Sequence, residues 1–177
     1  MPHIHTKPGQ HDHTVSAFIV RLDGNEPRIL LHRHKKMGVY MQFGGHIELD
    51  ETPWQTISHE LQEESGYSLD QLSILQPKER ITKLTRSTSH PQPVNYNTHS
   101  VDNEGNHFHT DIVYAFVTSE DPRSNPDNGE SNDIRLFTRN ELQRLSSQEI
   151  FENVREIGQF VLNESLSSWD KVPAKDI

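Results

Sequence analysis

The chain has 177 residues, 31% of them hydrophobic, which is enough for one domain with its own core. It contains no cysteine, which excludes disulfides, thiolate metal sites and cysteine nucleophiles. The formal net charge is −9, from 26 acidic and 17 basic residues, which argues against general nucleic-acid binding because that function needs a basic surface.

The first segment, residues 1–13, is polar and rich in histidine, and we expect a tail or an edge segment there. It lacks the hydrophobic stretch of a secretory signal. No apolar run in the chain approaches the roughly 20 residues of a membrane span. We therefore expect a cytoplasmic protein without membrane association. A single domain is expected over residues 14–166, followed by a loose C-terminal tail over residues 167–177.

Two apolar runs open the expected domain. Residues 15–21 and 28–32 are predicted strands of a hairpin, joined by the turn signal at residues 23–25. The basic loop that follows contains Arg33 and Lys36, which are candidates for contacting substrate phosphates; side chains that simply face solvent are the alternative. A short strand is then predicted over residues 39–43, ended by the glycine pair that follows it.

The next segment has clear signals for the start and end of a helix. Thr52 and Gln55 have the spacing of a capping box, and Pro53 suits the first helical position. Gly66 stands where a left-handed C-terminal cap is expected. These signals predict a helix over residues 53–65.

Strands and helices continue to alternate in the second half of the chain. A capping-box spacing from Thr138 to Glu141 predicts a short helix, and residues 149–166 have the apolar stripe of an amphipathic helix. The 95–101 and 107–118 runs are expected to form a second hairpin. The strands predicted in this half are residues 72–75, 79–85, 95–101, 107–118 and 134–137.

Three glutamates on the 53–65 helix, Glu60, Glu63 and Glu64, have the spacing i, i+3 and i+4. This spacing places three carboxylates on one helix face, where like charges repel. Magnesium and manganese ions are usually held by a few carboxylates together with substrate phosphates. The triplet is therefore a candidate metal site, and a solvated acidic helix face is the alternative.

A longer pattern of 23 positions, from Gly45 to Tyr67, surrounds this triplet. It consists of glycine, five residues, glutamate, seven residues, a basic residue, glutamate, an aliphatic residue, any residue, two glutamates, any residue, glycine and a bulky apolar residue. This pattern resembles the Nudix box. The resemblance implies an α/β Nudix fold, an α/β/α sandwich around a mixed β-sheet, and a hydrolase that cleaves a diphosphate linkage.

The resemblance also implies roles for individual residues. Glu60, Glu63 and Glu64 match the positions that bind divalent cations, Mg²⁺ or Mn²⁺, and one of these glutamates is a candidate general base. The Gly45 carbonyl matches a backbone ligand of some members, and Glu51 matches a carboxylate that orients the helix and its basic partner. Such cations neutralise the diphosphate, lower the pKa of a bound water and stabilise the leaving phosphate.

His59 departs from the family pattern, which usually has arginine at this position. An arginine holds carboxylates through a fixed, charged fork, whereas histidine is shorter and carries a charge only when protonated. His59 could pair with Glu63 or with Glu51. The sequence leaves two readings open: a working substitute in an active enzyme, or a weakened site in a slow enzyme or a non-catalytic nucleotide-binding module.

Other polar residues are candidates outside this pattern. His107, His109 and Asp111 alternate along a predicted strand and so share one face, with His99 expected across the hairpin near His107. They are candidates for lining a substrate or metal cavity, and a solvent-facing strand is the alternative. Glu130, in the loop before residue 134, is a candidate for an additional metal ligand or base.

The sequence does not define the substrate. The resemblance implies a nucleoside diphosphate derivative or a related small diphosphate compound. Isopentenyl diphosphate isomerisation, another activity of this fold, relies on a cysteine that this chain lacks. A homodimer is compatible with the sequence.

Overall fold

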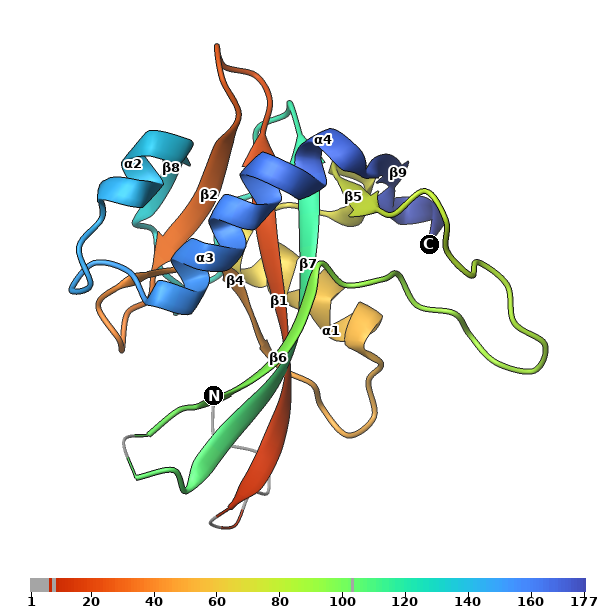
Figure 1. Cartoon of the computed structure of the whole chain (residues 1–177), viewed down its shortest axis with the longest axis horizontal. Helices are drawn as coiled ribbons and strands as arrows, with labels where there is room; N and C mark the ends of the chain where they lie inside the picture. The colour runs from red at the N-terminus through yellow and green to blue at the C-terminus, as the bar shows by residue number, and fades with distance from the viewer. Residues whose placement is uncertain (1–6, 8, 103) are drawn as a thin grey trace.

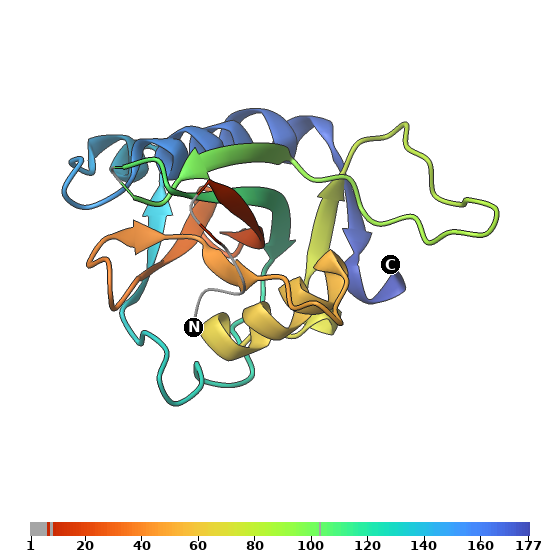
Figure 2. The ribbon, with the colours of Figure 1, turned by 90° about the horizontal axis from the view of Figure 1, so that it is seen from below.

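A computed structural model describes Lys7, residues 9–102 and residues 104–177. Within these ranges the chain forms one mixed sheet of nine strands, with helices on both of its faces (Figures 1 and 2). This arrangement is the predicted α/β/α sandwich. The strands are β1 (Gln10–Arg21), β2 (Arg28–Arg33), β3 (Tyr40–Met41), β4 (Phe43–His46), β5 (Ser73–Gln76), β6 (Asn95–Ser100), β7 (His107–Thr118), β8 (Ile134–Thr138) and β9 (Asp170–Pro173).

The long strands β1 and β7 form the centre of the sheet, whose main path runs β3-β2-β1-β7-β5-β9. They pair in parallel along their full length, while β4 also pairs with β1, β6 with β7 and β8 with β2. Helical segments cover the two faces. They are α1 (Pro53–Glu60), η1 (Leu61–Ser65), η2 (Leu69–Gln71), α2 (Arg139–Arg144), α3 (Glu152–Phe160), η3 (Val161–Ser165), α4 (Leu166–Ser168) and η4 (Ala174–Asp176).

Each face of the sheet has its own hydrophobic core. Along β1, Phe18 and Val20 pack on the side of α3, where they meet Val154. Val15, Ala17 and Ile19 pack on the other side against Ile57 and Leu61, which belong to α1 and η1. Even-numbered β1 residues therefore face α3 and odd-numbered ones face α1, as the alternation of a strand requires.

The helix predicted over residues 53–65 is confirmed, as α1 followed without a break by the π-helical turn η1. Thr52 and Gln55 form the predicted capping box. Gly66 ends the helix with φ +74°, and a Cβ there would stand 2.0 Å from the carbonyl oxygen of Ser124. Only glycine satisfies both conditions without strain.

The N-terminal boundary was predicted too late. Strand β1 begins at Gln10, so residues 10–13 of the expected tail lie in the centre of the sheet; residues 1–6 and 8 lie outside the described residues. The start of β1 carries buried polar side chains, Asp12, Thr14 and Ser16. Hydrogen bonds to β7 satisfy all three, since Thr14 and Ser16 donate to Asp111 and Asp12 bonds to His107. Apolar alternation does not predict this part of the strand, because its buried side chains are polar.

The expected loose tail over residues 167–177 is also wrong. Strand β9 pairs antiparallel with β5, and the buried Ala174 donates its backbone N–H to the Leu72 carbonyl at 2.9 Å.

Two further differences concern strands. The glycines at 44 and 45 continue β4 instead of ending it, and residues 79–85 belong to a projecting loop (Figure 2) whose apolar side chains, Ile81 and Leu84, are exposed.

The remaining predicted elements are present with small shifts. The β1–β2 and β6–β7 hairpins form, and the capping box of Thr138 and Glu141 begins α2. The final amphipathic helix begins at Glu152, three residues after its predicted start, and continues through η3 into α4. None of the helices in the described ranges is long and apolar enough to cross a membrane.

A candidate metal centre and active site

The glutamates of the Nudix-like pattern lie where α1 and η1 pack against β4. Glu60 and Glu64 are buried, with relative exposures of 4% and 8%, whereas Glu63 is exposed. The Glu64 carboxylate accepts a hydrogen bond of 2.7 Å from the backbone N–H of Gly44. A Cβ at Gly45 would stand 2.0 Å from Glu60 Oε1, so glycine gives the Glu60 carboxylate the space it occupies.

Burial and the closeness of the carboxylates raise the pKa values of the two buried glutamates in this cluster. Burial, together with the negative charges of Glu63, Glu130 and Glu51, raises the pKa of Glu60 to about 7. Burial also raises the pKa of Glu64 well above its usual range, against the opposing effect of the Gly44 hydrogen bond. A divalent cation would remove this penalty, since it neutralises the carboxylates and takes oxygen ligands. The donor set therefore fits Mg²⁺ or Mn²⁺.

Glu130 reaches this cluster because its loop is attached to the end of the helix. The backbone N–H of Asp127 donates to the Glu63 carbonyl at 2.7 Å, and Lys35 Nζ donates to the Gly129 carbonyl at 2.7 Å. The Glu130 charge raises the pKa of both Glu60 and Glu64. The structure thus brings Glu130 to the other glutamates, and its role as ligand or base stays a prediction.

His59 has one of the two partners considered from the sequence. Its Nδ1 lies 2.7 Å from Glu51 Oε1, and its side chain is 62% exposed. The other oxygen of Glu51 accepts a hydrogen bond of 2.8 Å from the Thr56 hydroxyl. Glu51 is therefore held between two residues of α1, which anchors the preceding loop to the helix.

The contacts of the two basic candidates, Arg33 and Lys36, do not assign them a role in binding substrate. Arg33 Nε donates to the Gly38 carbonyl at 2.9 Å, and Lys36 is exposed. Arg33 also lines a cavity of about 130 Å³ together with Tyr40 and Arg135, and no glutamate of the cluster lines it. Phosphate contacts by Arg33 and Lys36 stay predictions.

A second polar cluster is formed by the ends of three strands. Asp12 on β1, His46 on β4, and His107 and His109 on β7 come together, and we call these four residues the histidine cluster. His107 Nε2 lies 2.8 Å from Asp12 Oδ2, and His46 Nε2 lies 3.5 Å from the same oxygen. The His109 ring stands edge-on to both His46 and His107, with centroid distances of 4.9 and 5.1 Å.

Two of the predicted members are arranged differently from expectation. His99 was expected across the hairpin from His107, but in the observed register of β6 and β7 it lies opposite His109. Asp111 stands apart: its two carboxylate oxygens accept hydrogen bonds of 2.8 Å from the hydroxyls of Thr14 and Ser16.

Asp12 and His46 were missed by sequence reasoning. Asp12 fell in the segment expected to be a tail, although the even spacing of Asp12, Thr14 and Ser16 is a strand signal in polar form. His46 lies inside the Nudix-like pattern, at a position that the pattern leaves variable. No local spacing connects either residue to His107 and His109.

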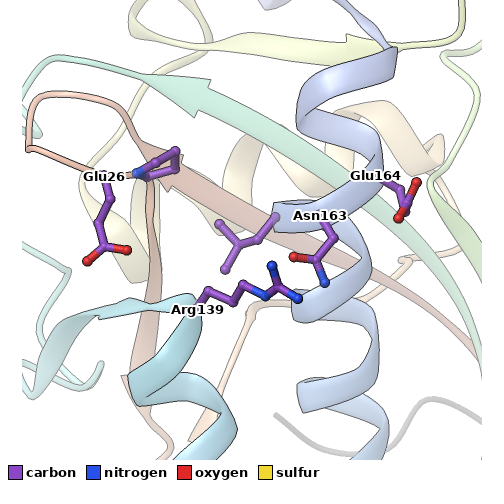
Figure 3. A pocket seen from close by; sticks show the side chains of 6 residues that line it. Glu26, Arg139, Asn163 and Glu164 are labelled. Carbon is purple, nitrogen blue, oxygen red and sulfur yellow. The ribbon is translucent and has the colours of Figure 1, made fainter.

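A cavity of about 420 Å³ lies away from both clusters, between the β1–β2 turn, α2 and η3 (Figure 3). None of the candidate site residues lines it. Its lining is polar and includes both charges, and nothing in it converges as the side chains of the two clusters do. The lining residues are Glu26, Pro27, Arg139, Leu162, Asn163 and Glu164.

Comparison with known families agrees with this geometry. The model of the NUDIX domain matches residues 12–156, so the chain belongs to the Nudix family. No curated protein matches the sequence. The resemblance of residues 45–67 to the Nudix box is thereby confirmed as a family relationship.

Solved structures give the same result for the fold. A Nudix-family hydrolase from Clostridium perfringens is 29% identical with a TM-score of 0.71, over 87% of this chain and 97% of that chain. The NUDIX domain of Shewanella oneidensis NrtR, solved with ADP ribose, is 15% identical with a TM-score of 0.59, over 85% and 86%. The Escherichia coli dihydroneopterin triphosphate pyrophosphohydrolase is 15% identical with a TM-score of 0.59, over 89% and 97%. Family and neighbours together support a Nudix-type pyrophosphohydrolase.

Proposed function

We propose that this protein is a divalent-metal-dependent hydrolase that cleaves the diphosphate linkage of a nucleoside diphosphate derivative or a related small compound. The observation that carries the proposal is the buried pair Glu60 and Glu64, whose carboxylates are pressed against the backbone of β4. Buried carboxylates without a cation are unfavourable as anions. A site built to hold cations explains why the chain keeps them there.

Glu60, Glu63 and Glu64 would hold Mg²⁺ or Mn²⁺, with the backbone of Gly45 beside them. When bound, the cation supplies charge neutralisation of the diphosphate and a more acidic bound water. A water oxygen attacks phosphorus, the bridging phosphorus–oxygen bond breaks, and the water proton passes to a carboxylate. Glu130 is a candidate for that acceptor, since its loop is held against the helix end.

His59 and Glu51 are proposed as positioning residues. The 2.7 Å contact between them, and the hydrogen bond from Thr56 to Glu51, hold the loop after β4 at a fixed distance from α1. The rate of metal-dependent hydrolysis is sensitive to the positions of the residues that bind the metal ion. The pair would thus keep the Gly45 backbone at a fixed position relative to the helix glutamates.

The loop that carries Arg33 and Lys36 is proposed to face the substrate phosphates. Its support is the hydrogen bond from Lys35 to Gly129, which places that loop next to the one that carries Glu130. The positively charged side chains of this loop would then form ion pairs with a phosphate that is bound to the metal ions. The neighbours indicate which compounds to test first: ADP ribose was bound to NrtR, and a Caenorhabditis elegans neighbour is an Ap4A hydrolase.

The direct test is turnover. The purified protein is incubated with ADP ribose, diadenosine tetraphosphate, dihydroneopterin triphosphate and nucleoside triphosphates, with Mg²⁺ or Mn²⁺ and with EDTA as control. Release of nucleotide or phosphate that EDTA abolishes is the expected result. Binding of one of these ligands without turnover would instead support a non-catalytic nucleotide-binding module, the alternative raised by His59.

A further inference from the structure

We propose that the histidine cluster is a second metal site, for a first-row transition ion of which Zn²⁺ is the representative. The proposal is independent of the hydrolase function, because it concerns side chains on a different face of the sheet. It assigns Asp12, His46, His107 and His109 as the ligands.

The distances already bring potential ligand atoms together. One ligand atom each of Asp12, His107 and His109 can be chosen so that all three lie within 4.8 Å of one another. His46 Nε2 lies 3.5 Å from Asp12 Oδ2, which adds a fourth donor on the same side. A zinc ion is held by three or four nitrogen and oxygen ligands at about 2.0–2.2 Å, so small side-chain rotations close the present spacing around an ion.

Among the four proposed ligands, His109 gives the strongest reason to expect an ion. Its Nε2 is buried and has no hydrogen-bond partner among the described residues. A buried ring nitrogen without a partner is unfavourable. A metal ion would satisfy that nitrogen.

The histidine cluster and the glutamates are separated by the sheet itself. Gly45 pairs with Val15 and His46 pairs with Thr14, so successive β4 residues point to opposite faces. Gly45 contacts Glu60 on the α1 side, whereas His46 contacts Asp12 on the α3 side. One ion cannot be shared between the two clusters.

The ligand types also differ between the two clusters. Imidazole nitrogen suits zinc, copper, iron and nickel, whereas magnesium and calcium prefer oxygen. Three histidines and one aspartate therefore select against Mg²⁺, the ion proposed for the glutamates. This difference allows the two sites to be measured separately in one sample.

The fold explains what an ion here would do. At the end of the sheet where β1 begins, β1 and β7 extend below α3 in Figure 1, and no helix covers this face there. A bound ion would join β1, β4 and β7 at that end. Because the unfolded chain lacks the assembled site, the ion would raise the thermal unfolding temperature.

The test uses metal-free full-length protein, with excess Mg²⁺ present to occupy the glutamates. Zn²⁺ binding is measured by equilibrium dialysis with metal analysis, and Co²⁺ binding by its visible absorption. One tightly bound ion per chain is expected, and His109→Ala should weaken Zn²⁺ binding by at least about tenfold, since even outer-shell changes reach that size. The matched control is His13→Ala, an exposed position next to Asp12 on the opposite face of β1.

Several results would overturn the proposal. Zn²⁺ affinity that is unchanged in His109→Ala and in the conservative variant Asp12→Asn, both checked for folding by circular dichroism, would do so. So would Zn²⁺ binding lost in Glu60→Gln, which would assign the ion to the glutamates. Zinc lost only when His3, His5, His11 and His13 are replaced together would assign it to the N-terminal segment. None of these measurements needs turnover, so they stand whether or not the hydrolase function holds.

Discussion

The two polar clusters of this protein lie on opposite faces of the same sheet and differ in how the chain assembles them. The glutamates come mainly from one helix and the loop before it, with Glu130 added by a loop that contacts the helix end. The histidine cluster draws on β1, β4 and β7, with Asp12 and His109 nearly a hundred residues apart. The first site is built by local spacing and the second by strand register.

Burial acts on the two clusters in opposite directions. It is the largest cause that raises the pKa of Glu60 to about 7 and the largest cause that lowers the pKa of His109 to about 4, because in each case burial disfavours the charged form. Near neutral pH a proton therefore competes with a metal ion for the glutamates and hardly at all for His109. The two sites should differ in the ion they bind and in how pH controls that binding.

Removing a glutamate ligand should have the largest effect. Glu60→Gln keeps the shape of the side chain but removes its anionic oxygens. Because outer-shell changes alone cost about 10- to 100-fold, loss of a ligand should lower kcat/KM by about 100-fold or more. Steady-state hydrolysis with Mg²⁺ measures this loss, and Glu79→Gln, in the exposed loop, is the control. Near-normal turnover in Glu60→Gln would remove Glu60 from the ligand set.

Adding a single methyl group at Gly45 should weaken the same site less. The new Cβ would stand 2.0 Å from Glu60 Oε1, so the carboxylate must move away. We expect Gly45→Ala to lower Mg²⁺ affinity by about tenfold or more and to leave Zn²⁺ binding at the histidine cluster intact. Gly24→Ala is the control, since the atoms nearest to its Cβ belong to the flexible Arg28 side chain, the first at 3.1 Å. Equal Mg²⁺ affinity in both variants would contradict the prediction.

The metal-free protein should lose stability as pH rises, through Glu60. The pKa of Glu60 is about 7 in the folded chain and 4.5 in the reference state. A raised carboxyl pKa contributes stability that is fully present below about pH 4.5 and is lost as pH rises through 7. Relative to Glu60→Gln, the wild type should lose on the order of 3 kcal/mol across this window.

Urea unfolding of both proteins at pH 4.5, 6 and 8, in metal-free buffer, measures the difference. Added Mg²⁺ should restore the wild type at pH 8 and leave Glu60→Gln unchanged. The His109→Ala variant is the second comparison. The pKa of His109 is about 4 in the folded chain and 6.5 in the reference state, so the wild type should lose stability relative to His109→Ala as pH falls below about 6.5, in the opposite direction to the Glu60 effect. A constant difference between wild type and Glu60→Gln at all three pH values would refute the assignment to Glu60.

The contrast between the clusters also explains how far the sequence could predict them. The helix over residues 53–65, its capping box and its glutamate face follow from spacing within one segment, and all are present. Strand β1 was predicted from Val15 onwards because its apolar alternation begins there. The pairing of Asp12 with His109 depends on the parallel register of β1 and β7, which no residue pattern within either strand encodes.

The C-terminal error has a similar origin. Strand β9 is short and its side chains are mostly exposed, so its sequence has no strand pattern of its own. Backbone pairing with β5 holds it in the sheet. Polar or exposed strands are thus visible only once their partners are known, which applies equally to the start of β1.

His59→Arg should have the smallest effect and addresses the departure from the family pattern. His59 is 62% exposed and contacts Glu51 at 2.7 Å, a geometry that a longer guanidinium can also reach. An arginine is always charged, whereas a histidine pairs as a cation only when protonated. We expect hydrolysis to be unchanged or increased, by less than about tenfold, with any gain mainly above neutral pH.

The pH profile of kcat/KM for wild type and His59→Arg measures this effect, with His59→Ala as the variant that removes the contact. An arginine that restores what alanine loses would establish the ion pair with Glu51 as the function of this position. Complete loss of turnover in His59→Arg would show instead that histidine has a role that charge alone does not supply. Zn²⁺ binding at the histidine cluster should be the same in all three proteins, because the sheet separates His59 on α1 from that cluster.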